Sequence, residues 1–438
     1  MTASGRSLNE GVRRREVFGW AMYDFANSGY TTVVLTAVFN AYFVGVVAGG
    51  ADWATLAWTA TLSASSLVVM LLMPALGAYA DRRGAKKRVL GWTTLACVAS
   101  TALLAFSGPG TIALAVIAVV ISSACFAIGE SLVAAFLPEL ARPEAIGKVS
   151  GWGWSFGYLG GMLTLGLCLA YVLFSQSKGL PATHFVPVAM VLTAAVFALA
   201  SIPTFVLLRE RVPSVASTAE AADMSFSSSM SRAFQRLVLA WRQSREFEDF
   251  KRLLVCAVAY QAGISVVVAL AAIYAEQVLG FRQTQTMMLI FLVNIAAAVG
   301  AFAFGHFQDR IGHRRALGLT LAGWIVMTGL AAMATGPGLF WCAAVLAGLC
   351  MGSSQSAGRA IAGLLAPVHR RAEFYGLWTF AVRVSAIIGP LTYGLVTWLS
   401  GGNHRLAILS TGVFFVAGAL ILRRVDVARG VHQAQLPS

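Results

Sequence analysis

The chain has 438 residues, of which 58% are hydrophobic and only 11% are charged, and its mean hydropathy is +0.75. In soluble domains about a quarter of all residues are charged, so this composition excludes an ordinary water-soluble globular protein. The formal net charge of +14 would suit nucleic-acid binding, but Lys and Arg gather in alternate loops between apolar stretches. That placement indicates membrane topology, and no nucleic-acid partner is expected.

Twelve apolar stretches are each long enough to cross a bilayer, which requires about 20 helical residues. They cover about 17–47, 54–79, 89–107, 111–137, 149–174, 184–208, 252–275, 284–306, 316–334, 339–365, 374–400 and 405–422. Both termini are expected to be cytoplasmic, because the tails and the even-numbered loops hold most of the basic residues. The predicted fold class is all-α integral membrane, with 12 transmembrane helices in two six-helix halves.

The first stretch carries polar residues where lipid would not favour them. An ionisable group at the centre of a membrane helix costs roughly 2.5–3.5 kcal/mol and therefore indicates a function. Asp24 is such a group, and Tyr23, Asn27 and Tyr30 follow one another beside it at spacings of four and three. These spacings place the four residues along one polar stripe, which we expect to face a solute cavity.

One turn motif, G-x-x-x-D-R-x-G, follows the second stretch and recurs after the eighth. Its residues are Gly77, Asp81, Arg82 and Gly84 in the first copy, and Gly305, Asp309, Arg310 and Gly312 in the second. A chance repeat is rare, so the motif indicates an internal duplication. We interpret its charged residues as cytoplasmic gates that latch one conformation. The alternative is that they only set the topology.

The fourth and fifth stretches contribute further candidates. Glu130 is an acid inside the fourth stretch. The fifth contains a glycine motif formed by Gly153, Gly157, Tyr158, Gly160 and Gly161. It is similar to the helix-5 motif of antiporters, except that Tyr158 replaces a proline. The same glycines would also let two helices pack closely, and both interpretations stay open.

A polar segment at 209–251 separates the first half, 1–208, from the second half, 252–438. Phe234, Leu237 and Trp241 recur in it at helical spacing among arginines. This pattern predicts an amphipathic helix on the cytoplasmic surface of the membrane, where it would contact lipid headgroups. A regulatory partner docking there is the alternative.

The second half carries basic groups inside its spans where the first half carries acids. Arg359 and Arg383 lie at about the same depth as Asp24 and Glu130, and Gln355 precedes Arg359 by one helical turn. Glu130 and Arg359 occupy nearly equivalent positions of the duplication. The four charges could join and separate during transport, grip a zwitterionic substrate, or form a permanent structural salt bridge.

The duplicated twelve-span pattern with its two motif loops resembles the major facilitator superfamily over essentially the whole chain. Five segments are similar, more narrowly, to the vacuole-effluxer family, which is related to the autophagy-linked vacuolar amino-acid permease. They are Trp20–Tyr30, Leu137–Glu139, Ser150–Gly161, Phe374–Gly376 and Gly389–Pro390. The resemblance implies a major facilitator fold and export of amino acids or similar small solutes.

Other chemistries lack a signal in the sequence. No P-loop motif occurs, and the six cysteines and six histidines show no metal-ligand spacing. We therefore expect no cofactor, no metal and no enzymatic activity. The predicted function is secondary active transport of a small polar solute, with amino acids as candidates and with proton-coupled export, by a monomer in a bacterial inner membrane. A membrane-embedded enzyme and a non-transporting sensor or scaffold are the alternatives.

Overall fold

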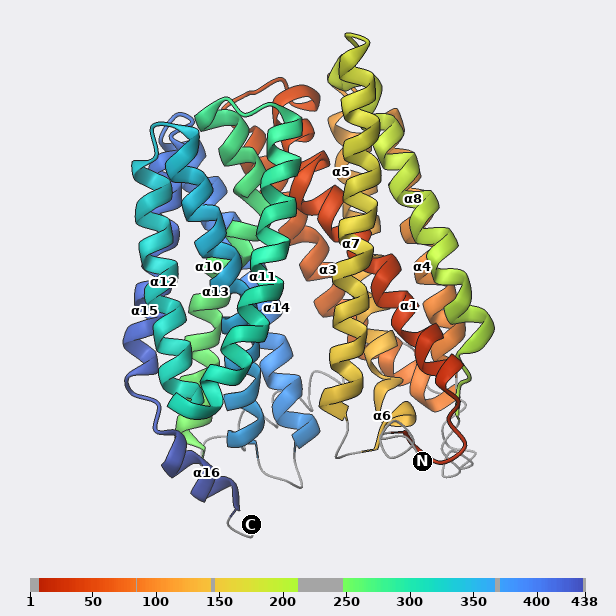
Figure 1. Ribbon diagram of the computed structural model, residues 1–438, viewed down its shortest axis with the longest axis vertical. Helices are drawn as coiled ribbons and strands as arrows, with labels where there is room; N and C mark the ends of the chain where they lie inside the picture. The colour runs from red at the N-terminus through yellow and green to blue at the C-terminus, as the bar shows by residue number, and fades with distance from the viewer. Residues whose placement is uncertain (1–7, 84, 143–145, 212–246, 367–370, 436–438) are drawn as a thin grey trace. The chain divides into compact units, whose positions relative to one another are not determined.

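The computed structural model describes residues 8–83, 85–142, 146–211, 247–366 and 371–435. These residues are almost entirely helical (Figure 1), and the extended pairing among them is one isolated bridge between Leu8 and Ala141. The described ranges contain 12 helical segments that are long and apolar enough to cross a membrane. The predicted all-α membrane fold is thus confirmed. The amphipathic helix predicted around Trp241 lies outside the described residues.

The chain divides into two compact units. Unit 1 comprises Met1–Gly49 and Leu67–Ser231, and unit 2 comprises Gly50–Ser66 and Arg232–Ser438. The first turns of the second span therefore group with unit 2, where Ser63 Oγ donates a hydrogen bond of 3.3 Å to the carbonyl of Ile387.

The helices before residue 212 are α1 (Arg14–Tyr30), η1 (Thr31–Ala37), α2 (Phe39–Tyr42), η2 (Phe43–Val47), α3 (Ala54–Arg83), α4 (Lys86–Leu103), η3 (Leu104–Phe106), α5 (Ile112–Ala134), α6 (Leu137–Leu140), α7 (Ile146–Ser177) and α8 (Ala182–Leu207). Those after residue 246 are α10 (Glu248–Leu279), α11 (Gln283–Ile311), α12 (His313–Met333), α13 (Pro337–Leu365), α14 (Arg371–Leu399), α15 (His404–Leu422) and α16 (Val427–Gln435).

The first span is an interrupted helix rather than a regular one. After α1 it continues as the π-helical segment η1, and after the short α2 as a second π-helical segment, η2. The change begins where β-branched residues from Thr31 to Val34 follow one another, and such residues crowd the preceding turn of an α-helix. π-Helical turns are rare and often occur at functional sites.

The two units use the same close contact at corresponding helices. In unit 1, α1 packs against α7 and α8, and in unit 2, α10 packs against α14 and α15. Gly160 of α7 lies directly on the backbone of Phe25, and Gly389 of α14 lies in the same way on the backbone of Ala262. The duplication seen in the loop motifs therefore extends to the packing of the helices.

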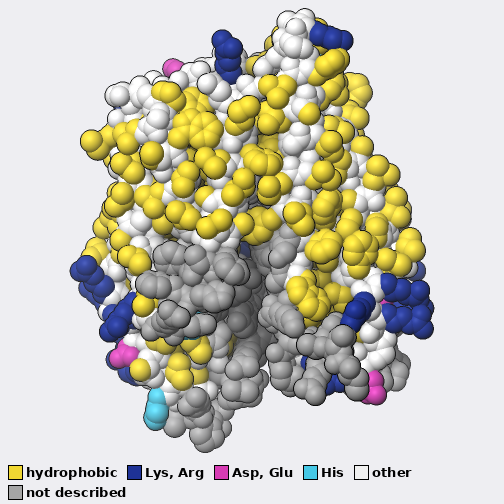
Figure 2. Space-filling view, viewed as in Figure 1, with side chains coloured by type: hydrophobic (Ala, Val, Ile, Leu, Met, Phe, Trp, Pro, Cys, Tyr) yellow, Lys and Arg dark blue, Asp and Glu magenta, His cyan; other side chains and the backbone are white. Residues whose placement is uncertain are grey.

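Large apolar side chains also cover the outside of the helices. Leu199 is 67% exposed, and Leu95, Ile117, Val326 and Leu420 are more than half exposed. On the face shown in Figure 2, hydrophobic side chains cover the middle of the helices, while Lys and Arg lie toward the helix ends. A helix that is apolar on all sides is typical of a membrane span, because lipid solvates its outer face.

Candidate functional site

Two residues of the predicted polar stripe are fixed inside unit 1. The hydroxyl of Tyr23 lies 3.0 Å from Oγ1 of Thr94 on α4, and the hydroxyl of Tyr30 lies 2.7 Å from Oγ of Ser122 on α5. Both tyrosines are fully buried. They serve as hydrogen-bonded contacts between helices, because this face of α1 meets protein rather than lipid.

Asp24 and Asn27 differ from these tyrosines. Asp24 is partly buried, and Glu130 of α5 is near enough to interact with it electrostatically. Asn27 is 4% exposed, and its Oδ1 atom has no hydrogen-bond partner among the described residues. A buried polar atom without a partner costs about 1–3 kcal/mol, so its presence needs an explanation. Asp24, Glu130 and Asn27 thus place two carboxyl groups and an amide oxygen in the region of unit 1 around the middle of α1.

The glycine motif of α7 lies along the same stretch of α1. A Cβ atom added at Gly153 would overlap the Asp24 carboxylate, and one at Gly157 would lie 2.8 Å from Oγ of Ser28. Gly161 faces Thr32 in the same manner. Tyr158, between these glycines, is partly buried. The glycines thus let α7 approach α1 beside Asp24, whereas an antiport role for the motif stays a prediction.

Unit 2 contains a reciprocal amide pair that includes the candidate residue Gln355. Gln261 of α10 donates to Oε1 of Gln355 at 3.0 Å, and Gln355 of α13 donates back to Oε1 of Gln261 at 3.2 Å. Arg383 of α14 is partly buried. The backbone of Arg359 belongs to α13, but its side chain lies outside the described residues. The predicted layer of acids and bases therefore stays a prediction.

A tyrosine–glycine contact recurs next to the charged positions of both units. The Tyr23 hydroxyl lies against Gly129, directly before Glu130, and the Tyr260 hydroxyl lies against Gly358, directly before Arg359. In each unit the absence of a side chain on the glycine makes room for the hydroxyl. No sequence pattern indicated this pairing, because the partners are about 100 residues apart and neither type is unusual in a membrane helix.

Most of the predicted gate residues are described by their backbone only. Gly77, Asp81 and Arg82 belong to the last turns of α3, and Gly305, Asp309 and Arg310 to those of α11. Gly84 lies outside the described residues. Gly312 directly precedes α12 with a φ of +86°, a conformation that favours glycine. The latch role of the aspartates stays a prediction.

An ion-pair network that sequence reasoning missed ties the ends of unit 1 together. Glu16 in the first turn of α1 is almost fully buried and pairs with Arg211 at 2.8 Å. Glu139 of α6 pairs with Lys86 at 3.0 Å and accepts the backbone N–H of Arg211. Glu210 accepts the backbone N–H groups of Lys86 and Lys87 at the start of α4, where an anion is favoured. In the sequence, the one sign of this network was Glu139, which belongs to the Leu137–Glu139 segment of the family resemblance.

Unit 2 has a corresponding pair. Asp249 in the first turn of α10 has a side chain that is 1% exposed, and Arg429 of α16 donates to its two oxygens at 2.7 and 2.8 Å. The backbone N–H of Asp426 donates to the same carboxylate. This hydrogen bonding raises the pKa of Arg429. In both units, an acid at the start of the first helix thus binds an arginine that follows the last span.

We expect Arg429→Gln to lower the unfolding temperature of the purified protein by several degrees, because the buried Asp249 carboxylate loses its bidentate partner. Thermal unfolding followed by the loss of monodisperse protein in detergent would measure the effect. Arg424→Gln is the matched control, since its exposed side chain precedes α16 by a few residues. Equal unfolding temperatures for the two variants would show that the Asp249 pair does not stabilise unit 2.

Comparison with known proteins gives consistent results. The family described as vacuole effluxer Atg22 like matches residues 12–435. An uncharacterized MFS-type transporter, YxiO of Bacillus subtilis (strain 168), is 25% identical over 428 residues, covering 95% of this chain and 96% of YxiO. Autophagy-related protein 22 of Cryptococcus neoformans is 25% identical over 307 residues, covering 66% of this chain. The chain's match spans 54% of that fungal protein, about half its length.

Solved structures share the fold at low sequence identity. A bacterial homologue of the human lysosomal transporter Spinster has a TM-score of 0.71 with 13% identity and covers 98% of this chain and 99% of its own. A point mutant of the nucleoside transporter NupG has a TM-score of 0.69 with 14% identity, covering 94% and 98%. A D-xylose–proton symporter has a TM-score of 0.67 with 16% identity, covering 95% and 99%.

Proposed function

Because the chain belongs to the vacuole effluxer Atg22-like family and is a multi-pass membrane transporter of the MFS type, we propose that it exports a small polar solute by proton-coupled alternating access. Amino acids are the first substrates to test. The name of the family supports export, and the names of the fungal relatives connect the chain with autophagy-related proteins. The name of YxiO gives no substrate.

One observation carries the proposal, namely the acidic cluster between the first and fourth spans of unit 1. Asp24 of α1 and Glu130 of α5 bring two carboxyl groups near each other, and the Oδ1 atom of Asn27, which has no hydrogen-bond partner among the described residues, lies one turn beyond Asp24 on α1. Neighbouring carboxylates repel each other in a medium of low dielectric constant, and a bound cation relieves that repulsion. The ammonium group of an amino acid and a proton are two such cations, and in this proposal the same cluster serves substrate binding and proton coupling.

The fold is compatible with other solutes, since the similar solved structures include transporters of nucleosides and of xylose. Those ligands carry hydroxyl groups rather than an ammonium group. The acidic cluster around Asp24 favours a cationic or zwitterionic solute over a neutral sugar, because a desolvated carboxylate gains most from a charged partner. Xylose and a nucleoside are therefore the appropriate negative probes.

Transport by the purified full-length protein in proteoliposomes would test the proposal. Each of the 20 common amino acids is offered in labelled form, with an imposed pH gradient and with the gradient collapsed by an ionophore. We expect at least one amino acid to move, faster with the gradient and independently of sodium. If a labelled amino acid binds but never crosses the bilayer, the sensor interpretation replaces the proposal. If only xylose or the nucleoside moves, the substrate class is wrong.

A further inference from the structure

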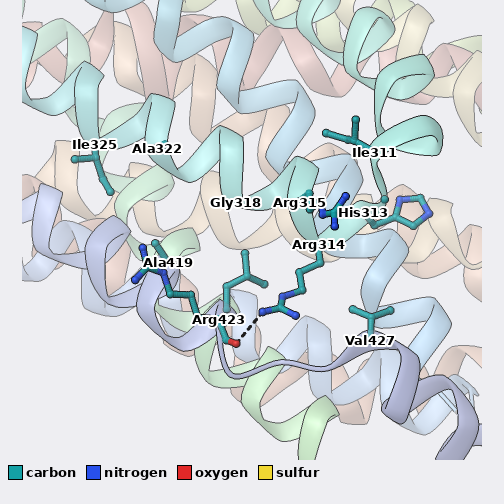
Figure 3. A pocket seen from close by; sticks show the side chains of 12 residues that line it. Ile311, His313, Arg314, Arg315, Gly318, Ala322, Ile325, Ala419, Arg423 and Val427 are labelled. Carbon is teal, nitrogen blue, oxygen red and sulfur yellow. Dashed lines mark hydrogen bonds between the residues drawn. The ribbon is translucent and has the colours of Figure 1, made fainter.

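A surface groove of about 800 Å³ lies in unit 2 where α12, α15 and the start of α16 meet. Figure 3 shows Arg314 and Arg315 at the beginning of α12, and Gly318, Ala322 and Ile325 farther along the same helix. Ala419 and Arg423 contribute from the end of α15 and the residue after it. The described lining includes no aspartate or glutamate. The groove thus combines a basic end with an apolar wall.

The basic end is suited to an anion. Arg314 donates a hydrogen bond of 2.8 Å to the carbonyl of Arg423, which fixes its guanidinium between α12 and α15 and leaves its other N–H groups for a ligand. Arg315 and Arg423 are exposed. The first turn of α12 has no side-chain cap, so its backbone N–H groups add to the positive potential. The lining residue His313 also has a buried Nδ1 atom without a partner among the described residues.

The apolar wall continues from this end into the membrane span. Gly318, Ala322 and Ile325 succeed one another along α12, and a helix rises 1.5 Å per residue, so Ile325 lies roughly 16 Å beyond Arg314. The span itself is His313–Met333. Small side chains on α12 and Ala419 on α15 leave the trough open, while the stacked rings of Trp324 and Phe415, 5.0 Å apart, hold the two helices together. A soluble ion would need no such wall.

We propose that this groove binds one anionic phospholipid. Its phosphodiester headgroup contacts Arg314, Arg315 and Arg423, and one acyl chain lies along Gly318, Ala322 and Ala419. Charge complementarity selects an anionic headgroup, since three arginines line the groove and no carboxylate occurs in the described lining. The apolar wall selects a lipid over free phosphate, because only a lipid buries methylene groups there. The site is separate from the Asp24 cluster, so the proposal does not depend on the transported solute.

Titration of the purified full-length protein with phosphatidylglycerol, followed by native mass spectrometry, would test this site. Two further ligands are titrated in the same way. One is phosphatidylcholine with the same acyl chains, and the other is inorganic phosphate. We expect phosphatidylglycerol to bind about 10-fold more tightly than phosphatidylcholine, because its headgroup carries a net negative charge. Arg314→Gln combined with Arg315→Gln should weaken phosphatidylglycerol binding about 30-fold, or about 5-fold for each lost charge near the membrane surface.

Gly318→Leu tests the acyl-chain wall independently of charge. A Cβ atom at this position meets nothing closer than Leu422, 3.9 Å away, so the longer side chain enters the groove without disturbing the helix. Phosphatidylglycerol binding should weaken about 10-fold, as expected for the loss of two or three buried methylene groups. Binding of inorganic phosphate should not change. Because leucine favours helix more than glycine does, this variant remains informative if the arginine variant fails to fold.

Two variants serve as matched controls. Gly329→Leu adds the same side chain to α12 at a position with nothing within 4 Å and outside the groove lining. Arg282→Gln removes an exposed charge from the loop before α11. Both should bind phosphatidylglycerol like the wild type. Equal phosphatidylglycerol binding by the wild type, Gly318→Leu and the arginine variant would overturn the proposal. The proposal would also be overturned if Gly318→Leu weakened phosphate binding as much as phosphatidylglycerol binding.

Discussion

Asp24→Asn is expected to reduce gradient-driven solute transport to the level of protein-free vesicles while membrane insertion stays near that of the wild type. The substitution removes a charge from a membrane helix and keeps the size of the side chain. That size matters because the Asp24 carboxylate lies against Gly153 of α7, and a longer side chain would collide with that helix. Removing an intramembrane charge lowers the cost of insertion, so lost transport would not reflect lost folding.

Exchange of labelled for unlabelled substrate without a gradient separates two roles of Asp24. Exchange requires no net proton movement, so it persists in Asp24→Asn if the residue carries only the coupling proton. It disappears if the carboxylate holds the substrate. Asp52→Asn is the matched control, because Asp52 is an exposed acid between the first two spans and outside the cluster. Wild-type gradient-driven flux in Asp24→Asn would remove Asp24 from both roles.

Gly160→Ala is expected to destabilise the protein strongly, by about 1–3 kcal/mol or more, because one added methyl group has no space. The new Cβ would overlap the carbonyl oxygen of Phe25 and lie 2.7 Å from its Cα. These are backbone atoms of α1, so no side-chain rotation can relieve the overlap. The helices α1 and α7 would have to separate, which would also displace Gly153 from Asp24.

Gly166→Ala provides the control on the same helix. Nothing lies within 4 Å of a Cβ at Gly166, so this change should be neutral or slightly stabilising through its helix propensity. Gly389→Ala, where α14 meets the backbone of Ala262, should reproduce the loss in unit 2. Thermal unfolding and yield of the purified variants would be compared. Wild-type stability of both Gly160→Ala and Gly389→Ala would show that these close contacts do not stabilise the units.

The order of the residues is enough to predict the class of fold and the duplication. Hydropathy is a local property that sums along each stretch, so twelve spans follow from the order of the residues, and a helix lies at each of these stretches. The repeated loop motif likewise needs only the order of residues. The four polar positions all lie in α1, and the spacing of Tyr23, Asn27 and Tyr30 places these three on one side of that helix, because α-helical periodicity is fixed by the backbone. Their role at a solute site stays a prediction.

The contacts of these polar side chains, in contrast, follow from the packing of α1 against its neighbours. This packing places Tyr23 and Tyr30 in hydrogen bonds with α4 and α5, and it leaves the Asn27 oxygen without a partner among the described residues. Periodicity cannot distinguish these cases, since both tyrosine and asparagine are polar at the same spacing. The π-helical turns of the first span were likewise absent from the prediction, because hydropathy reports the length of a span and not its winding.

Ion pairs show the same limit most clearly. Glu16 and Arg211 are separated by 195 residues, and Asp249 and Arg429 by 180, and the side chain of each acid is almost fully buried. In the sequence these residues are ordinary charges near the ends of spans, which the positive-inside pattern already explains. Their pairing depends on how the first and last helices of each unit cross. That crossing is set by side-chain packing between distant segments, which no local pattern of residues records.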